Sequence, residues 1–284
     1  MPPTDRRTFL QTLGAAALAA GLDRAGMGVP PRPAATLDRI GLQLYTVRGA
    51  LERDFEGTLD RVAAIGYREV EFAGYYGKTP HDVWAALEKR GLAAPSAHVP
   101  FEALKGNWRG ALEDARVIGH RYVVVPWIPP AERRSLDGYK RVARLFNRAG
   151  AVPRELDLQF AYHNQAFEFA RLGGRVPYDV LLAETDPKLV ALELDLYWIR
   201  KGGGDPLAYF ARYPGRFPMV HVKDMDKTRQ RGMTDVGRGV IDFKRIFARR
   251  AQAGIAHWFV EHDQPADPFA SIQASYDYLK RLEF

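Results

Sequence analysis

Short apolar or alternating runs of residues recur along the chain and predict eight strands. Strands of a parallel sheet are buried on both faces, so their sequences are close to continuously apolar. The expected strands span residues 40–45, 68–72, 93–98, 122–126, 156–163, 189–195, 217–222 and 257–261.

Segments with apolar residues at helical spacing lie between these strands. They span residues 55–65, 81–89, 108–118, 139–149, 206–212, 243–253 and 271–282. Glycine follows several of them, at the position where a left-handed residue commonly ends a helix. These glycines are Gly66, Gly91, Gly119 and Gly254.

The alternation of strand and helix without a linker predicts an α/β fold, a single (β/α)8 TIM barrel over residues 36–284. A doubly wound open sheet is the main alternative. A dinucleotide-binding sheet would carry G-x-G-x-x-G after its first strand, and this chain instead has Gly202, Gly203 and Gly204 after the sixth.

The composition limits the class of protein and of metal site. With 46% hydrophobic and 26% charged residues, the chain differs from disordered, collagen-like and coiled-coil proteins. The sequence contains no cysteine, so a bound metal would have to be held by histidine, carboxylates or water.

Residues 1–35 are expected to be an export signal and linker. Arg6 and Arg7 precede an apolar run at 13–22 and a Pro/Gly-rich stretch at 26–33, which resembles a twin-arginine signal and predicts a periplasmic protein. The run is too short to span a bilayer comfortably, so no stable membrane anchor is expected after signal removal. A basic tail or an amphipathic anchor is the alternative. Removing the four arginines and two aspartates of this segment lowers the formal net charge from +7 to +5.

Ionisable residues close three consecutive apolar runs. Asp195, His221 and Glu261 lie at the carboxyl ends of the sixth, seventh and eighth expected strands, and the active sites of TIM barrels lie at the carboxyl ends of the strands. Burying such groups is costly unless they are paired or bind a metal. One nitrogen and two carboxylates suit Mn²⁺, Zn²⁺, Mg²⁺ or Fe²⁺. The fourth ligand is expected from Glu168, with His163 as the second choice.

Each of the three residues also has a purely structural interpretation. Asp195 can cap the segment that follows it, His221 can be a hydrogen-bonded core histidine, and Glu261 can pair with Lys223. The presence of all three residues at the ends of neighbouring strands favours a metal site over three separate structural roles.

Other polar and aromatic residues near strand ends are candidates for binding a sugar. His98 and Glu71 can hydrogen-bond hydroxyl groups or simply pair with neighbouring side chains. Tyr45, Trp127 and Trp198 can form a wall on which a sugar ring stacks, or belong to the core.

These residues lie within runs that resemble a known family. The chain from about residue 40 to 282 resembles the sugar phosphate isomerase/epimerase family of xylose isomerase-like TIM barrels. The similar runs are residues 162–169, 184–187, 194–198, 221–225 and 260–261.

The resemblance implies one divalent metal held by Glu, Asp, His and Glu, matched here by Glu168 or a neighbour, Asp195, His221 and Glu261. Many relatives close the fifth strand with the metal glutamate, whereas this chain has His163 there, so the first ligand stays open. No glycine-rich phosphate cradle follows the last two strands, which favours a neutral sugar or cyclitol over a sugar phosphate.

A mechanism follows from these parts. A metal that polarises a carbonyl makes the neighbouring carbon acidic, and Glu261, His163 or Glu168 would remove its proton. Lys223 can steady the enolate oxygen, or form a salt bridge with Asp224 or Glu261. Returning the proton elsewhere gives isomerisation or epimerisation, the first expectation. The alternative is expulsion of the oxygen on the carbon next to the deprotonated one, which gives dehydration or glycoside elimination.

Two other classes of function stay open. A periplasmic barrel of this kind can bind a sugar without turning it over. The barrel is also similar to zinc apurinic endonucleases, but its Lys and Arg residues are scattered, and few of its seven histidines lie at strand ends. We therefore expect a small-molecule sugar as the partner and no nucleic acid.

Overall fold

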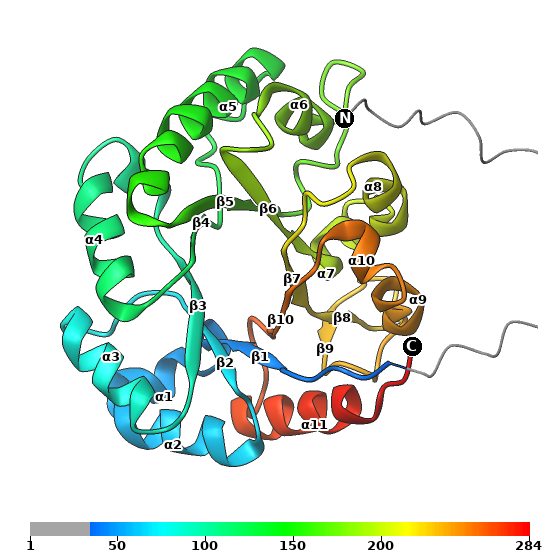
Figure 1. Cartoon of the computed structure of the whole chain (residues 1–284). Coiled ribbons are helices and arrows are strands. Elements are labelled where there is room, and N and C mark those ends of the chain that lie inside the picture. Colours follow the sequence, from blue (N-terminus) through cyan, green and yellow to red (C-terminus); the bar gives the residue numbers. More distant parts are fainter. Residues whose placement is uncertain (1–34) are drawn as a thin grey trace, which may run out of the picture. The chain divides into compact units, whose positions relative to one another are not determined.

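The structure, a computed structural model, describes residues 35–284 and contains a closed barrel of eight parallel strands, surrounded by helices (Figure 1). Around the barrel the strands follow the order β1, β10, β7, β6, β5, β4, β3 and β2. The predicted TIM barrel is confirmed, and the open sheet is excluded.

The expected export signal lies almost wholly outside the described residues and stays a prediction. Within the described part of the chain, no helix is long and apolar enough to cross a membrane.

Each barrel strand is short, and most are followed by at least one helix. The strands are β1 (Gly41–Gln43), β2 (Glu69–Phe72), β3 (Ala93–His98), β4 (Tyr122–Val125), β5 (Gln159–His163), β6 (Val190–Asp195), β7 (Met219–Val222) and β10 (His257–Val260), with a hairpin of β8 (Asp224–Met225) and β9 (Met233–Thr234). The helices are α1 (Arg48–Arg53), α2 (Phe55–Ile65), α3 (Pro80–Glu88), α4 (Trp108–Ile118), α5 (Leu136–Ala151), α6 (Pro177–Glu184), α7 (Leu196–Lys201), α8 (Pro206–Arg212), α9 (Phe243–Phe247), α10 (Arg250–Ala253) and α11 (Pro268–Arg281).

Three predicted elements differ from the structure. The expected strand at 40–45 ends at Gln43, because Leu44–Val47 form a 3-10 turn. The expected strand at 156–163 begins only at Gln159, because Pro153–Leu156 form a 3-10 turn that ends at Asp157 with a φ of 57°. The expected helix at 243–253 is split into α9 and α10. The pattern also missed α1, α6, α7 and the β8–β9 hairpin.

The predicted helix ends are confirmed where glycine adopts a left-handed conformation. Gly119 ends α4 with a φ of 92°, and Gly254 ends α10 with a φ of 85°. A side chain disfavours this conformation, so glycine stops the helix at low cost.

The barrel interior consists of an apolar plug beneath a polar layer. Buried side chains from four strands form the plug: Tyr122, Val124, Ala161, Met219 and Phe259. Since side chains alternate along a strand, the residues two positions further along β5, β7 and β10 also face inward. Those residues are His163, His221 and Glu261, which places them directly above the plug.

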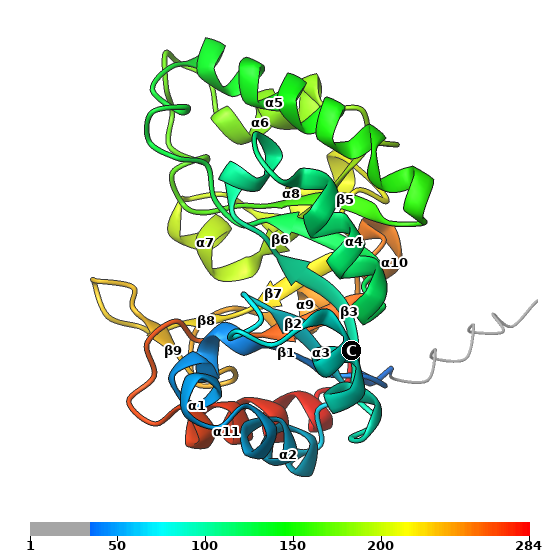
Figure 2. The same cartoon turned by 90° about the vertical axis from the view of Figure 1, so that its left-hand side faces the viewer.

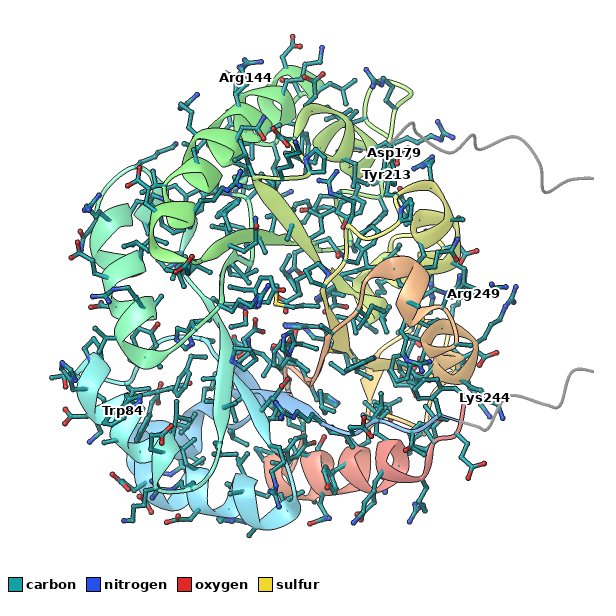
Figure 3. All side chains as sticks on the ribbon, viewed as in Figure 1. Trp84, Arg144, Asp179, Tyr213, Lys244 and Arg249 are labelled. Carbon is teal, nitrogen blue, oxygen red and sulfur yellow. The ribbon has the colours of Figure 1, made fainter. Side chains whose placement is uncertain are left out.

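The strand ends that carry this polar layer face away from the chain's carboxyl terminus. Figure 2 shows the β8–β9 hairpin, which follows β7, on the side opposite the C-terminus. At the other end, backbone amides of Ala35 and Phe284 donate to each other's carbonyl oxygens at 2.9 and 3.0 Å. Charged side chains such as Arg144 and Lys244 point outward from the ring of helices (Figure 3).

Candidate active site

Four buried side chains meet where β5, β6, β7 and β10 end. His163, Asp195, His221 and Glu261 each contribute one nitrogen or carboxylate oxygen, and these four atoms lie within 4.8 Å of one another. The structure therefore brings together the three residues singled out at the last strand ends, with His163 as the fourth member.

One nitrogen at the centre of this cluster lacks a hydrogen bond. His221 Nδ1 lies 2.7 Å from Glu261 Oε2 and 3.8 Å from Asp195 Oδ2. Neither contact has hydrogen-bond geometry, so within residues 35–284 this buried nitrogen has no hydrogen-bond partner. A buried nitrogen without a hydrogen bond is costly in a protein interior, and its position among carboxylates suits a group that binds between them.

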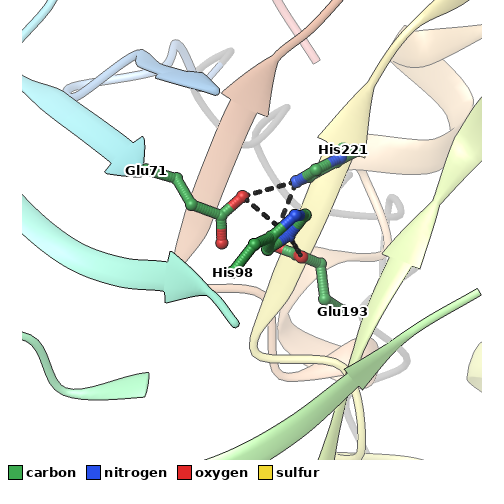
Figure 4. Close-up of side chains that lie close together, drawn as sticks. All are labelled: Glu71, His98, Glu193 and His221. Carbon is green, nitrogen blue, oxygen red and sulfur yellow. Dashed lines mark hydrogen bonds and ion pairs between the residues drawn. The ribbon is translucent and has the colours of Figure 1, made fainter. Parts of the chain in front are cut away.

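The opposite nitrogen of the same ring is hydrogen-bonded to one glutamate and lies near a second. His221 Nε2 lies 2.7 Å from Glu71 Oε2 and 3.3 Å from Glu193 Oε1, and Figure 4 shows the carboxylates flanking the ring. His98 Nε2 lies 2.8 Å from Glu193 Oε2 and 3.2 Å from Glu71 Oε2. The four side chains form a second cluster, which shares His221 with the first and in which only His98 is partly exposed.

Glu71 is itself fixed by neutral donors. Gln43 Nε2 donates to Glu71 Oε2 at 2.6 Å, and the Ser96 hydroxyl donates to Glu71 Oε1 at 2.5 Å. Burial raises the pKa of Glu71, but His98 and His221 outweigh this effect and hold the pKa well below its usual range. Glu71 is therefore an ionised anchor for the His221 ring.

Sequence reasoning missed Glu193. It lies two positions before Asp195 on β6, so both side chains face the barrel interior. The signal was present in the run Leu192-Glu193-Leu194-Asp195, where acidic residues alternate with leucine.

Lys223 brings a buried ammonium group to the cluster. Its Nζ lies 2.7 Å from Glu261 Oε2, 2.7 Å from Asp263 Oδ1 and 3.2 Å from Asp195 Oδ2. The suggested pairing of Glu261 with Lys223 thus occurs. Asp195 also caps α7, because its Oδ1 accepts a hydrogen bond from the Trp198 backbone amide at 2.7 Å.

These contacts fix the charges of the cluster. Burial raises the pKa of Glu261, but Lys223 and His221 outweigh it and lower the pKa. Burial lowers the pKa of Lys223, but Asp195, Glu261 and Asp263 raise it well above its usual value. The site thus holds an ionised carboxylate beside a protonated amine.

Glu168, the first choice for a fourth ligand, does not lie with this group. It accepts hydrogen bonds from the Tyr162 hydroxyl and, at 2.9 Å, from the Gln165 backbone amide. Tyr162 alternates with His163 on β5 and therefore faces the helices, where its ring centroid lies 5.0 Å from that of Phe146. Its partner Glu168 is thus drawn to the outside of the strand.

Replacing Glu168 with glutamine is expected to change how stability depends on pH. Burial raises the pKa of Glu168 from 4.5 to about 8, so the folded state keeps a proton that the unfolded chain releases. Its contribution to stability therefore falls as pH rises through this interval, by up to ~1.4 kcal/mol per pH unit. In urea unfolding, Glu168→Gln should gain stability relative to wild type between pH 5 and pH 7.5. Parallel curves for the two proteins would contradict this assignment.

A pocket of about 490 Å³ opens above the cluster. Six of the proposed site residues line it: Tyr45, His98, Trp127, His163, Lys223 and Glu261. Two other proposed substrate contacts are not among its lining residues. Glu71 is fully buried beneath His98, and the Trp198 ring lies 5.8 Å from Lys223 Nζ.

The chain is similar in sequence and fold to several known proteins. The chain is 26% identical over 268 residues to an inosose dehydratase from Lacticaseibacillus casei, covering 80% of this chain and 89% of the relative. It is 29% identical to a sugar phosphate isomerase/epimerase from Parabacteroides distasonis whose crystal structure superimposes with a TM-score of 0.77, covering 86% and 98% of the two chains.

A more distant structure shares the fold alone. The probable 3-DHS dehydratase from Bacillus anthracis is 12% identical and superimposes with a TM-score of 0.64, covering 85% of this chain and 98% of that one. The family described as xylose isomerase-like TIM barrels matches residues 59–282. This match includes seven of the eight barrel strands and every member of the cluster around His221, and the chain belongs to that family.

Proposed function

We propose that the protein is a metal-dependent lyase that removes water from the ketone form of a cyclitol or neutral sugar. The observation that carries this proposal is the buried His221 Nδ1, which has no hydrogen-bond partner within residues 35–284 and lies in one cluster with His163, Asp195 and Glu261. Two members of this cluster, His163 and Glu261, line the pocket. Inosose dehydratases among the relatives support the direction of the reaction.

The donor set fits a divalent cation. Two imidazoles and two carboxylates suit Mn²⁺, Zn²⁺ or Fe²⁺ and, less well, Mg²⁺, which prefers oxygen ligands. In that position a divalent cation would polarise the substrate carbonyl and acidify the adjacent carbon. His163, Asp195, His221 and Glu261 would hold it.

Glu71 and Glu193 would orient this site from beneath. A histidine that binds a metal usually donates its other ring N–H to a carboxylate, which fixes the ring and its tautomer. His221 Nε2 hydrogen-bonds with Glu71 Oε2 at 2.7 Å and lies 3.3 Å from Glu193 Oε1, so its Nδ1 stays aimed at the other three ligands.

Glu193→Gln is therefore expected to weaken metal binding by about 10–100-fold, although Glu193 is not a ligand. Equilibrium dialysis against Mn²⁺ or Zn²⁺ measures this change without relying on activity. The control is Glu69→Gln, which removes a buried glutamate that pairs with His257 at 2.7 Å, below the plug. Equal affinities for Glu193→Gln and wild type would show that Glu193 does not orient His221.

Glu261 is placed to act as the base. It lines the pocket, and Lys223 and His221 keep it ionised despite its burial. In the reaction, the C–H bond next to the ketone breaks and its proton passes to Glu261, or to His163 on the same wall. The C–O bond on the next carbon then breaks, and the oxygen leaves as water after taking up a proton.

Lys223 is placed to stabilise the negative charge that develops on a substrate oxygen during the reaction. It also lines the pocket and holds its proton firmly, so its ammonium group can hydrogen-bond an oxygen that becomes negative. Its two other carboxylate partners, Asp195 and Asp263, keep the ammonium at this position.

Isomerisation or epimerisation is the second candidate, favoured by the likeness to the sugar phosphate isomerase/epimerase from Parabacteroides distasonis. Both reactions begin with the same proton abstraction and differ in the next step. An isomerase returns the proton to the substrate, whereas a lyase expels the neighbouring oxygen.

One experiment separates these candidates. The metal-loaded protein is incubated with a keto-inositol and with a keto-glucose in deuterated solvent, and the products are followed by mass spectrometry and ultraviolet absorption. Loss of one water with a new conjugated ketone supports the lyase. Deuterium in an isomer or epimer without loss of water supports the second candidate. Binding of the ketone without either change would overturn both and leave a sugar-binding barrel.

A further inference from the structure

The pocket above the cluster has two chemically different walls. Residues that follow β5, β7 and β10 line one side with polar groups, including His163, Lys223 and Asp263. Residues at or after the ends of β1 to β4 line the other side and are mostly apolar: Tyr45, Ala73, Gly74, His98, Val99, Pro100, Pro126 and Trp127. We call this second side the apolar wall.

Two exposed aromatic rings stand on the apolar wall, and neighbouring arginines hold them. Tyr45 and Trp127 are 40% and 41% exposed. The Arg48 guanidinium lies 4.0 Å from the centroid of the Tyr45 ring and donates to the Tyr45 and Asp263 carbonyl oxygens. This contact fixes one edge of the pocket mouth.

The other ring is supported in a similar way. The Arg133 guanidinium lies 5.7 Å from the centroid of the Trp127 ring and 3.7 Å from that of Phe167, and its Nε donates to the Ile128 carbonyl oxygen at 3.0 Å. Rings held in this way lose little conformational freedom when a ligand binds, so their exposed area is available for binding energy.

The pocket is larger than one ring requires. A cavity of about 150 Å³ accommodates one six-membered carbon ring, whereas this pocket measures about 490 Å³. The space beyond a keto-cyclitol or keto-sugar seated at the polar wall therefore has room for a second group.

The chemistry of the apolar wall decides what that group is. Among its side chains only the Tyr45 hydroxyl, the Trp127 indole N–H and the His98 imidazole are polar, and His98 Nε2 already contacts Glu71 and Glu193. Several hydroxyl groups of a second sugar would find few partners there, and buried hydroxyls without partners are costly. A flat apolar group would instead bury area against two aromatic rings and the two prolines.

We propose that the substrate is a ring ketone with an aromatic substituent, which occupies the apolar wall between Tyr45 and Trp127. This inference rests on the proposed function only for the choice of the ketone end at the polar wall. It adds a binding subsite and a substrate class, an aryl-substituted cyclitol or sugar.

Binding of two matched probes tests the subsite. Isothermal titration of the metal-loaded, full-length protein compares a keto-inositol with its O-benzyl ethers. The best ether is expected to bind at least ~10-fold more tightly than the parent ketone, and Trp127→Ala should reduce this preference to ~2-fold or less. Tyr45→Ala, a second variant at the same wall, should reduce the preference in the same direction.

Trp84 provides the control. It is 46% exposed, like Trp127, but it lies on α3 at the outer rim of the molecule (Figure 3). Trp84→Ala should keep the full preference for the benzyl ether.

Several results would overturn the subsite. These are the absence of binding by both probes, equal affinities of wild type for both, and an unchanged preference in Trp127→Ala. A shift of Trp127→Ala to a smaller assembly in gel filtration would assign the wall to a second copy of the chain. Preference for the ether without any turnover would uphold the subsite and overturn the lyase, so the two proposals fail separately.

Discussion

Replacing His221 with alanine is expected to remove both the metal and the activity. Its ring joins the two clusters: Nδ1 faces the proposed ligands, and Nε2 hydrogen-bonds with Glu71 and lies near Glu193. Alanine leaves no nitrogen on either side. The loss of metal affinity should exceed the ~10–100-fold expected for an outer partner such as Glu193. Elemental analysis after gel filtration, performed on wild type and variant with equal metal exposure, measures the effect.

His120 offers a matched control, because it is also a buried histidine and lies outside the cluster, in the loop between α4 and β4. Its Nδ1 lies 2.6 Å from the Ala94 carbonyl oxygen and its Nε2 3.1 Å from the Tyr75 hydroxyl, so both nitrogens serve the fold. His120→Ala should lower stability and keep the metal. A full metal content in folded His221→Ala would refute the proposed centre.

Replacing Lys223 with methionine is expected to lower kcat strongly and leave the metal in place. The ammonium group is the cation that faces both the pocket and three carboxylates, and a positioned acid–base or charge-stabilising group contributes about 10²–10⁴-fold to a rate. The metal should stay, because Lys223 is not among the four ligands. Steady-state kinetics with metal analysis on the same samples separates the two effects.

The same variant should also be less stable, because removing one partner of a buried ion pair leaves carboxylates unpaired, at a cost of roughly 3–5 kcal/mol. Urea unfolding measures this cost, and Lys223→Arg, which keeps the charge, should recover most of it. Lys89→Met removes an exposed lysine 4.0 Å from Glu56 and should change neither stability nor activity measurably. Unchanged kcat in Lys223→Met would limit Lys223 to ion pairing.

The sequence predicted the barrel well because its signal is periodic. Apolar runs such as 190–195 and 219–222 are typical of strands buried on both faces of a covered parallel sheet, and the polar residues Asp195 and His221 at their carboxyl ends then converge. Helices and strands were missed where the sequence has no clear periodic pattern of apolar residues. Helix α7 begins directly after Asp195, and each strand of the β8–β9 hairpin has only two residues.

That hairpin region is organised by one buried side chain instead of a pattern. Asp224 accepts hydrogen bonds from the backbone amides of Gly237, Gly239 and Ile241 at 2.9 to 3.1 Å. Contacts of this kind join a side chain to a loop more than ten residues away. They leave no periodic pattern in the sequence from which they could be predicted.

The site was predictable where a strand sets the direction of a side chain. Asp195, His221 and Glu261 follow strand alternation, and so does Glu193, which was missed although it obeys the same rule. Glu168 lies in a loop, where no alternation fixes its direction. The outward hydroxyl of Tyr162 decides where it lies.

The closure of the barrel has a consequence for synthesis of the protein. Gly41 of β1 pairs with Phe259 of β10, so the sheet closes only when almost the whole chain is available. A growing chain without β10 exposes unpaired edges at β1 and β7, and such edges are templates for aggregation. Asp195, His221 and Glu261 also belong to the last third of the chain. A ribosome-bound intermediate therefore lacks both a closed sheet and a complete set of the proposed ligands, so under the proposed function metal loading would follow synthesis of β10.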